Sequence, residues 1–495
     1  MIRNIMLLSA AACVALAQTP CEKLKSLSIP DVTITIAESV AAGPFRAPGA
    51  NAQAQPLQMP AFCRVAATLK PSSDSSVDIE VWLPANDWNG KYQAVGGGGW
   101  AGIISYPAMA TAVQEGYATS STDTGHKGGD ATFAPGHPEK VVDFAYRAIH
   151  EMTVKSKTLV NAFYGKAPRL SYFNGCSTGG RQGLMEAQKF PDDFDAILAG
   201  APANYQIHLH SFDMALALVY LKDKDHGLTA AKLATVNKAA LAACDAMDGV
   251  KDGLLNDPRK CKFDPSTLLC KNGDSDACLT APQVETIKAA YTPAKAKDGK
   301  LIYPALEPGG ETGWTRLINA TEPMGVSIGS FRYVLYQDPN WDWHLFDLDK
   351  DTAGADEKAG FINAINPDLS AFKAHGGKLL QYHGWSDQLI SPENSINYRD
   401  SVLKKMGAKQ DNWYRLFMIP GMQHCQGGPG VSQFSFMGAL ERWRESGVAP
   451  DSLVGAHVAN NRVDMTRPVC SYLQVAAYKG VGSTNDASNF ACKNP

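Results

Sequence analysis

Ser177 is the residue with the clearest chemical potential, because glycines frame it in the segment GCSTG at residues 175–179. The residues before it, RLSYFNG, predict a short strand, and the residues after it, GGRQGLMEAQKF, predict a helix. A serine at a tight strand-to-helix turn is exposed for nucleophilic attack, and the positive end of the helix stabilises a developing oxyanion. The alternative is a glycine-rich turn that contains a structural serine.

A nucleophilic serine requires a general base, and the base requires an acid that orients it. The segment LLQYHGWSDQLISP predicts a strand followed by Asp387 in a loop, and YRLFMIPGMQHCQGG predicts a further strand followed by His424. An isolated aspartate in a turn is usually a turn former, and an isolated loop histidine is usually just solvated. Serine, aspartate and histidine in this order, each after a strand, predict a catalytic triad.

The N-terminal segment MIRNIMLLSAAACVALAQ predicts a secretory signal peptide at residues 1–17. Arg3 supplies a positive region, an apolar stretch follows it, and small residues at 15–17 suit a cleavage site. A lipoprotein signal at Cys13 is the alternative, although the leucine usual three residues earlier is absent. The chain is therefore expected to be secreted or periplasmic.

Ten cysteines follow the signal peptide and predict five disulfides, because an even number in an exported chain favours complete pairing. Proximity along the chain suggests three of the pairs, namely Cys244–Cys261, Cys270–Cys278 and Cys470–Cys492. Four cysteines have no such near neighbour: Cys21, Cys63, Cys176 and Cys425.

Two of these four cysteines are adjacent to the predicted triad, since Cys176 precedes Ser177 and Cys425 follows His424. If the serine and the histidine meet within hydrogen-bond reach, their neighbours meet as well. A Cys176–Cys425 disulfide would then tie the two catalytic loops together. The rival interpretation makes Cys176 a thiol nucleophile, which an exported chain with an even cysteine count disfavours.

The order of the predicted elements indicates an α/β fold with a parallel sheet and an inserted lid. The segment SVDIEVWLPANDWNGKYQAVGGGGWAG predicts two strands and a glycine loop at residues 96–99, and strands alternate with helices up to residue 204. Residues 205–365 contain helical stretches, clustered cysteines and many aromatic residues, without a clear strand. The strand pattern then returns, so residues 18–204 and 366–495 are expected to form one catalytic domain around the 205–365 lid domain.

The motifs GCSTGGRQG, HGWSD and GMQHC together resemble the tannase and feruloyl esterase family of alpha/beta-hydrolases, to which mono-hydroxyethyl terephthalate hydrolases also belong. The resemblance extends over the mature chain and implies an alpha/beta-hydrolase core with a large inserted lid. It also implies a bridged Cys-Ser and His-Cys pair, with Ser177, Asp387 and His424 as the triad. The oxyanion donors that it implies are backbone amides of Thr178 and of the glycine loop, at Gly98 or Gly99.

An acidic loop in the lid, CDAMDGVKDGLLNDPRKC at residues 244–261, offers several oxygen ligands of the kind that hard cations bind. The spacing of an EF-hand is absent, and a solvated acidic loop is the alternative. The family resemblance implies a structural Ca2+ here without a catalytic role. The ligands that it implies are three side chains and two carbonyls: Asp245, Asp248 and Asp252, with Val250 and Leu254.

The whole sequence predicts a secreted serine esterase that hydrolyses small esters of aromatic carboxylic acids, feruloyl or other hydroxycinnamoyl esters first, with the plant cell wall as one source. Gallate esters and the terephthalate monoester are the alternatives, and a catalytically inactive, calcium-stabilised binding protein is the non-enzyme alternative. Arg316 and Arg332 could bind a substrate carboxylate, but surface ion pairs are the simpler interpretation. A net charge of −3 disfavours a nucleic-acid partner, and no apolar segment is long enough to span a membrane.

Overall fold

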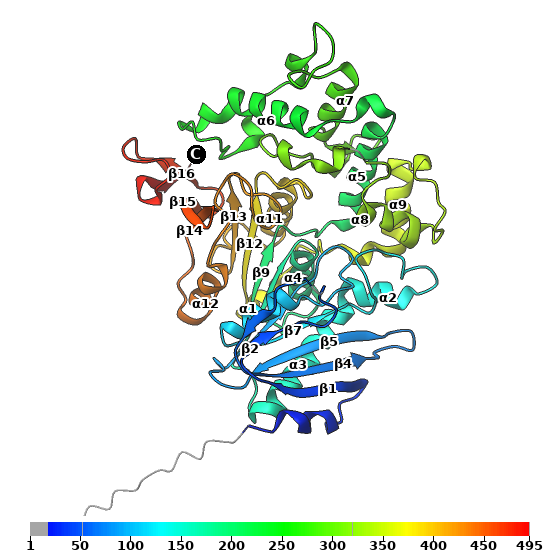
Figure 1. The fold of residues 1–495 in the computed structure, drawn as a ribbon, viewed down its shortest axis with the longest axis vertical. Coiled ribbons are helices and arrows are strands. Elements are labelled where there is room, and N and C mark those ends of the chain that lie inside the picture. Colours follow the sequence, from blue (N-terminus) through cyan, green and yellow to red (C-terminus); the bar gives the residue numbers. More distant parts are fainter. Residues whose placement is uncertain (1–17, 52, 319, 495) are drawn as a thin grey trace, which may run out of the picture.

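A computed structural model of the chain describes residues 18–51, 53–318 and 320–494. The predicted signal peptide at residues 1–17 lies outside the described residues and stays a prediction. None of the helices in the described ranges is both long enough and apolar enough to cross a membrane. The expected α/β fold is confirmed, since a large mixed sheet lies between helices and a mainly helical insertion covers one end of it (Figure 1).

The central sheet has nine strands, and its six consecutive strands from β7 to β13 run parallel to one another. The inner strands are buried almost throughout, as expected for parallel strands covered on both faces, whereas β4 alternates between buried and half-buried residues. In spatial order the strands are β1 (Val32–Val40), β4 (Phe62–Leu69), β5 (Val77–Pro84), β7 (Ala118–Thr122), β6 (Lys91–Val95), β8 (Leu170–Cys176), β9 (Ala196–Gly200), β12 (Lys378–Gly384) and β13 (Tyr414–Ile419).

Helices pack on both faces of this sheet and close two hydrophobic cores. One core contains residues of α3 (Ala148–Tyr164), α4 (Thr178–Lys189) and α11 (Glu393–Met406). The opposite face is covered by α1 (Tyr106–Gln114) and α12 (Phe436–Ser446). This three-layer arrangement fixes the carboxyl ends of β8, β9, β12 and β13 side by side, and the predicted triad follows three of these strands.

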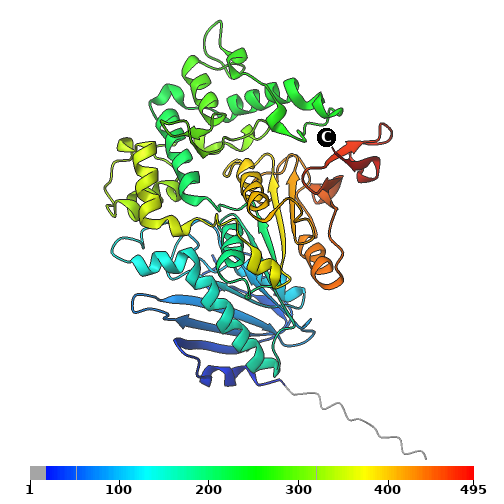
Figure 2. The same ribbon diagram turned by 180° about the vertical axis from the view of Figure 1, so that it is seen from behind.

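The chain between β9 and β12 forms the insertion, which lies over the carboxyl ends of the strands in both views (Figures 1 and 2). Its helices are α5 (Gln206–Tyr220), α6 (Ala230–Cys244), α7 (Ala281–Ala290), α8 (Gly325–Gly329) and α9 (Leu348–Ala359). The short α10 (Ser370–Ala374) follows them, and its Phe372 packs in the core of the sheet. The insertion also contains a hairpin of β10 (Ala294–Lys295) and β11 (Leu301–Tyr303), which the sequence did not predict because strands this short show no alternation.

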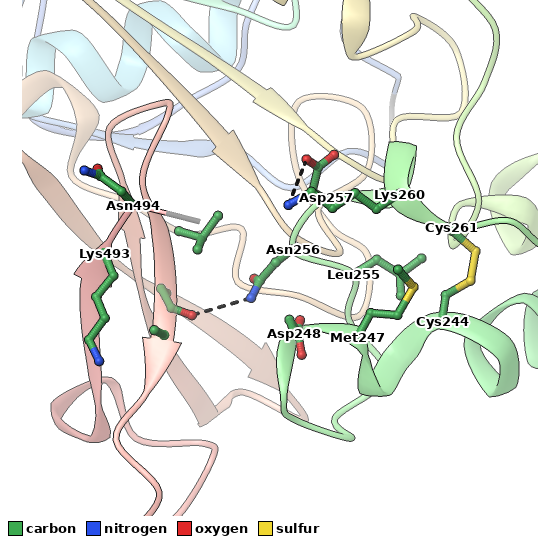
Figure 3. A pocket seen from close by; sticks show the side chains of 13 residues that line it. Cys244, Met247, Asp248, Leu255, Asn256, Asp257, Lys260, Cys261, Lys493 and Asn494 are labelled. Carbon is green, nitrogen blue, oxygen red and sulfur yellow. Dashed lines mark hydrogen bonds and ion pairs between the residues drawn. A yellow bond between two sulfur atoms is a disulfide. The ribbon is translucent and has the colours of Figure 1, made fainter.

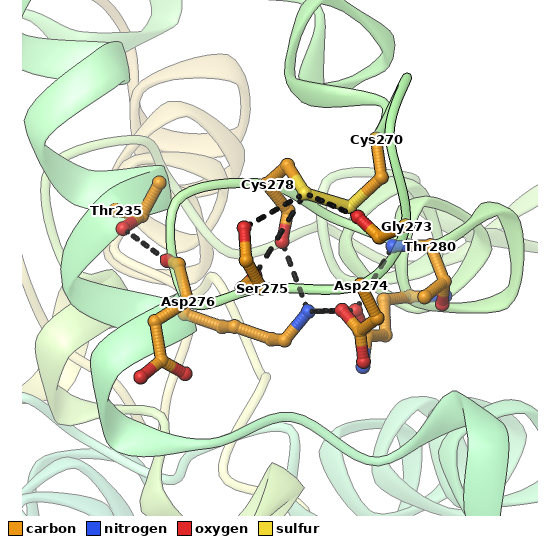
Figure 4. The surroundings of a disulfide bond; sticks show 10 residues. Thr235, Cys270, Gly273, Asp274, Ser275, Asp276, Cys278 and Thr280 are labelled. Carbon is orange, nitrogen blue, oxygen red and sulfur yellow. Dashed lines mark hydrogen bonds and ion pairs between the residues drawn. A yellow bond between two sulfur atoms is a disulfide. The ribbon is translucent and has the colours of Figure 1, made fainter.

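A buried lysine and a disulfide hold one loop of the insertion. Lys232 on α6 donates to the Cys278 carbonyl at 2.9 Å and to Gln283 Oε1 at 2.8 Å, and it forms an ion pair with Asp274. Figure 4 shows the Cys270–Cys278 disulfide in this loop with its surroundings. The exposed loop is thereby anchored to the helical core of the insertion.

The C-terminal segment after α12 forms two hairpins outside the main sheet. They comprise β14 (Ser452–Ala459) with β15 (Arg462–Cys470), and β16 (Val475–Tyr478) with β17 (Phe490–Lys493). A shorter hairpin near the N-terminus joins β2 (Gly43–Phe45) and β3 (Leu57–Met59), and α2 (Pro138–Val142) precedes α3. The described residues contain five disulfides, and four of them are the pairs expected from the sequence: Cys176–Cys425, Cys244–Cys261, Cys270–Cys278 and Cys470–Cys492. The fifth disulfide joins Cys21 and Cys63, for which the sequence analysis named no partner.

Candidate active site

Ser177 lies at the sharp turn between β8 and α4, where the sequence predicted it. Its backbone has φ +65° and ψ −126°, a conformation that residues other than glycine rarely adopt. The Ser177 N–H donates to the Gly200 carbonyl at 3.0 Å, and its own carbonyl accepts from Arg181 at 3.0 Å and Ala203 at 3.1 Å. These hydrogen bonds to α4 and to the segment at and after β9 stabilise the strained turn. Strained backbone held in this way is most common at functional sites.

Two glycines beside Ser177 are required by close backbone packing. A Cβ atom at Gly175 would lie 2.5 Å from the Gly179 carbonyl, and one at Gly180 would lie 2.4 Å from the Gly200 carbonyl. Real side chains essentially never approach backbone atoms this closely. The glycine-rich sequence around Ser177 therefore reflects how tightly the strand, the turn and the helix pack.

Asp387 follows β12 and is fully buried, with each carboxylate oxygen in hydrogen bonds. Its Oδ1 accepts from the backbone N–H groups of Leu389 at 2.9 Å and Ile390 at 3.0 Å. Its Oδ2 accepts from His424 Nδ1 at 2.8 Å and from His383 Nε2 at 3.1 Å. Burial alone would raise the pKa of Asp387, but the two histidines outweigh burial and hold the pKa well below its usual value.

His424 follows β13 and is oriented through both its ring and its backbone. Because Nδ1 faces an ionised carboxylate, it carries the proton and donates a hydrogen bond to Asp387, which leaves Nε2 as the basic nitrogen. The His424 N–H donates to Gln388 Oε1 at 3.1 Å. Burial alone would lower the pKa of His424, but the Asp387 carboxylate outweighs burial and raises the pKa above its ordinary value.

His383 is a residue of this site that the sequence analysis missed, although it is the first residue of the HGWSD motif. It is fully buried at the end of β12, and its Nε2 lies 3.1 Å from Asp387 Oδ2 and 3.2 Å from the Ile390 carbonyl. Since both neighbours are acceptors, Nε2 carries the proton, and Nδ1 accepts from Ser395 Oγ at 2.7 Å. His383 therefore donates a hydrogen bond to the same Asp387 oxygen that accepts from His424.

The Cys176–Cys425 disulfide joins the loops that carry Ser177 and His424. Its two Cα atoms are 6.0 Å apart, although 249 positions separate the cysteines in the sequence. Cys425 has φ +64°, so a second strained residue lies directly beside the site. The disulfide thus holds Ser177 and His424 against the same cavity, as the sequence predicted.

A cavity of about 430 Å³ opens at Ser177 and His424. The three residues expected to supply oxyanion donors, Thr178, Gly98 and Gly99, also line it. Thr178 begins α4, and its hydroxyl donates to the Gly99 carbonyl at 2.6 Å, which holds the glycine loop against the positive end of the helix. The structure therefore brings the predicted nucleophile, the predicted base and the expected oxyanion donors together around one cavity.

The two arginines considered as carboxylate readers are not among the described residues that line this cavity. Arg332 forms an ion pair with Glu322 at 3.8 Å, in keeping with the simpler interpretation. Arg316 also forms an ion pair, with Asp213 at 3.2 Å, but both side chains are buried. The expectation of a surface position is wrong for Arg316, because the insertion covers it.

The acidic loop of the insertion lies apart from the Ser177 cavity, and the three aspartates expected to bind a metal have intermediate exposure. The Asp245 carboxylate accepts from the Asp252 and Gly253 N–H groups at 3.1–3.3 Å, and Asp248 accepts from the Val250 N–H at 3.0 Å. The Asp252 carboxylate is shared with a residue outside the loop, because its Oδ2 forms an ion pair with Arg467 at 2.8 Å. Burial raises the pKa of Asp248, and the charges of Asp252 and Asp245 raise it further.

A second cavity, of about 290 Å³, separates this loop from the last hairpin of the chain. Figure 3 shows Met247, Asp248 and Leu255 on one side of it and Lys493 and Asn494 on the other. Neither the serine nor the histidine of the predicted triad lines this cavity. The candidate active site is therefore the cavity at Ser177.

The fold and the site geometry define an α/β-hydrolase. A strained serine turn, a buried aspartate and an oriented histidine follow strands that run parallel in one sheet, in the chain order of that class. The chain also matches the family described as Tannase and feruloyl esterase over residues 63–493 and belongs to that family. It is a carboxylic ester hydrolase.

Individual relatives agree with this assignment. The chain is 38% identical to an uncharacterized esterase of Xanthomonas campestris, over 99% of this chain and 94% of the relative. It is 36% identical to a probable feruloyl esterase B-2 of Aspergillus terreus, over 87% of this chain and 86% of the relative. The crystal structure of feruloyl esterase B from Aspergillus oryzae superposes with a TM-score of 0.90 at 34% identity, over 96% of this chain and 100% of that chain. Tannin acyl hydrolase from Aspergillus niger superposes with a TM-score of 0.75 at 25% identity, over 97% and 94% of the two chains.

Proposed function

We propose that the protein is a secreted serine esterase that cleaves esters of aromatic carboxylic acids through an acyl-enzyme. The observation that carries the proposal is the arrangement around one cavity: Ser177 on a strained turn, and His424 with its Nδ1 bound to the buried Asp387. A histidine held in this tautomer presents a basic Nε2, which is what activation of a serine hydroxyl requires.

In the proposed reaction Ser177 Oγ attacks the ester carbonyl while His424 Nε2 takes its proton. Asp387 stabilises the imidazolium that forms, and backbone amides of Thr178 and of Gly98 or Gly99 hold the tetrahedral oxyanion. The alcohol leaves with the proton from His424. Water then attacks the acyl-enzyme with the same base, and the free acid leaves with Ser177 restored.

Feruloyl and related hydroxycinnamoyl esters are the substrates that we propose first, because relatives that match most of the chain are described as a probable feruloyl esterase B-2 and a feruloyl esterase B. Gallate esters are the second candidate, since the structure of a tannin acyl hydrolase also superposes over most of the chain. Hydrolysis of methyl ferulate, methyl gallate and the terephthalate monoester, each measured as kcat/KM, tests the order. If the protein hydrolyses none of the three esters, the inactive binding protein becomes the better interpretation.

Export is proposed from the N-terminal sequence together with the five disulfides, because disulfides persist in oxidising compartments. Expression with the full N-terminal segment should therefore yield a mature protein that begins after residue 17. Mass spectrometry of the N-terminus of the exported protein checks this proposal.

We also propose a structural Ca2+ at the acidic loop, held by Asp245, Asp248 and Asp252 and by the carbonyls of Val250 and Leu254. The donor set fits, because Ca2+ binds oxygen ligands from one flexible loop. A bound Ca2+ would also offset the repulsion from Asp252 and Asp245, which adds to the effect of burial in raising the Asp248 pKa. The Cys244–Cys261 disulfide encloses the loop. No residue of the Ser177 cavity belongs to this set, so the ion would stabilise the fold and take no part in the reaction.

Removal of Ca2+ is expected to lower the melting temperature, because an ion that binds only the native state stabilises it by mass action. At a free Ca2+ concentration one hundred times its Kd, binding adds about 2.7 kcal/mol to the free energy of unfolding. Asp248→Ala should lower the melting temperature about as much as the chelator does, and the melting temperature of the variant should not change when chelator is added. Identical melting curves with and without chelator, together with elemental analysis that finds no calcium, would contradict the site.

The rate of ester hydrolysis is expected to fall at acid pH as His424 becomes protonated. Only the neutral imidazole can accept the Ser177 proton, so activity is present above the pKa of His424 and is lost as pH falls through it. Because Asp387 raises this pKa above its ordinary value of 6.5, the midpoint of the acid limb of kcat/KM should lie above 6.5. Asp387→Asn should move the midpoint down and lower kcat, and an unshifted profile in that variant would refute the assignment.

A further inference from the structure

Three potential metal ligands lie close together where α3, α4 and the loop before β9 meet. His150 is on α3, Glu186 is on α4, and Asp193 is in the loop between α4 and β9. Each residue offers one ligand atom, and these atoms all lie within 4.8 Å of one another. The cluster does not line the Ser177 cavity, and Glu186 lies near the opposite end of α4 from Ser177.

The Glu186 carboxylate is the reason to expect a ligand in this cluster. The residue is 1% exposed, and neither of its carboxylate oxygens has a hydrogen-bond partner among the described residues. The adjacent Asp193 carboxylate cannot satisfy it, because two ionised carboxylates offer acceptors and no donor. An unpaired buried charge is costly, so a buried carboxylate is normally paired, protonated or bound to a metal.

His150 and Asp193 are held beside each other by a third residue, Phe190. The His150 Nδ1 lies 2.7 Å from Asp193 Oδ2. The imidazole stacks on the Phe190 ring with the two centroids 3.9 Å apart, and the Asp193 N–H donates to the Phe190 carbonyl at 3.0 Å. The His150 side chain is 29% exposed, which gives an ion a route from solvent to the buried Glu186 carboxylate.

The charges around the cluster favour a divalent cation. Burial lowers the pKa of Lys157, and four carboxylates oppose this effect: Asp193, Asp195, Glu186 and Asp192. The Lys157 ammonium donates to the Asp193 backbone carbonyl, and Arg444 pairs with Asp195 at 2.8 Å. His375 lies 3.1 Å from Asp192 and adds a further cation only when it is protonated. Two permanent cations thus face four carboxylates, and an excess of negative charge remains.

The donor set distinguishes between metal ions. An imidazole nitrogen and two carboxylate oxygens suit Zn2+, which binds four ligands at about 2.0–2.2 Å and accepts water as one of them. Ligand atoms of a tetrahedral Zn2+ lie roughly 3.4 Å apart, so small adjustments of the three side chains would close the cluster around the ion. Ca2+ prefers a larger set made only of oxygen ligands, so the cluster does not suit it.

We propose that His150, Glu186 and Asp193 bind one Zn2+ ion that joins α3, α4 and the loop before β9. The ion would be structural, since the cluster lies outside the Ser177 cavity. The Zn2+ site shares no residue with the Ca2+ site proposed at the acidic loop. A proton on Glu186 is the competing occupant, because burial raises the pKa of Glu186 well above its usual value and the Asp193 charge raises it further.

The test measures Zn2+ binding by protein expressed without a histidine tag, stripped with chelator and returned to buffer that contains Ca2+. Wild-type protein should bind one Zn2+ per chain, and Co2+ in its place should give the visible absorption of a tetrahedral site. Glu186→Gln and His150→Gln each remove a ligand and should weaken Zn2+ binding at least about 100-fold. Zn2+ should raise the melting temperature of the wild type and of neither variant.

His137→Gln is the matched control, because His137 also contacts a carboxylate, Asp74 Oδ1 at 2.8 Å, but is not part of the cluster. His137→Gln and Asp248→Ala should both bind Zn2+ as tightly as the wild type does. Because His150 is partly exposed, His150→Gln remains informative if the buried Glu186→Gln fails to fold.

Three results would overturn the Zn2+ site. Wild-type protein that binds no Zn2+ at micromolar concentrations would leave a proton as the occupant of the cluster. Wild-type affinity in His150→Gln would exclude the imidazole as a ligand, and loss of Zn2+ from Asp248→Ala would place the ion at the acidic loop instead. None of these measurements depends on ester hydrolysis, so each outcome leaves the proposed function unchanged.

Discussion

Ser177→Ala is expected to reduce ester hydrolysis by about 10⁴-fold or more, because the groups of a triad act as a unit and loss of one removes most of the joint effect. The residual rate would come from the oxyanion donors and substrate binding, which the substitution leaves in place. The fold should survive, since the bonds that hold the turn come from the Ser177 backbone and not from its hydroxyl. The measurement is kcat/KM for methyl ferulate with purified protein.

A change in backbone strain at residue 177 would not explain the expected loss of activity in Ser177→Ala. Alanine, like serine, disfavours φ +65°, so the substitution changes the hydroxyl and leaves the conformational cost of the turn in place. Ser401→Ala on α11 is the matched control, because it removes a serine hydroxyl, one that donates to the Tyr398 carbonyl and does not line the Ser177 cavity. Ser401→Ala should retain full activity. A Ser177→Ala preparation with near-wild-type turnover would refute the serine mechanism.

The sequence predicted the serine turn and the order of its partners because those signals are local. A strand, a glycine-rich turn and a helix are encoded within the 20 residues 170–189, and β12 and β13 are apolar runs that end just before Asp387 and His424. The Cys176–Cys425 pair followed from the same logic. Two residues that must meet bring their chain neighbours together.

The sequence could not predict contacts that depend on how the elements pack in space. His383 is an ordinary strand residue by pattern, and only the turn after β12 brings its ring onto the Asp387 carboxylate. The sequence around Arg316 is compatible with a surface position, and only the packing of the insertion shows that its side chain is buried against Asp213.

Loss of the Cys176–Cys425 disulfide is expected to reduce turnover by about 10²-fold in a protein that still folds. Small displacements of catalytic groups cost factors of this size, and the disulfide is the covalent link between the Ser177 and His424 loops. The double variant Cys176→Ala with Cys425→Ala should keep its sheet, since the strands on either side are held by their own ladders. The measurements are kcat for methyl ferulate and the circular dichroism spectrum of the folded state.

A loss of stability must be separated from a loss of geometry, because a disulfide that closes so long a loop contributes about 5 kcal/mol in the simple chain-entropy treatment. The double variant Cys270→Ala with Cys278→Ala provides the comparison, since it removes a disulfide of the insertion that does not line the Ser177 cavity. It should lower the melting temperature and leave kcat unchanged well below that temperature. Equal turnover in both double variants would show that the Cys176–Cys425 bond serves stability alone. A thiol mechanism makes the opposite prediction for the native enzyme: iodoacetamide without reductant would alkylate Cys176 and abolish activity, whereas the disulfide requires a linked pair of peptides in the unreduced digest.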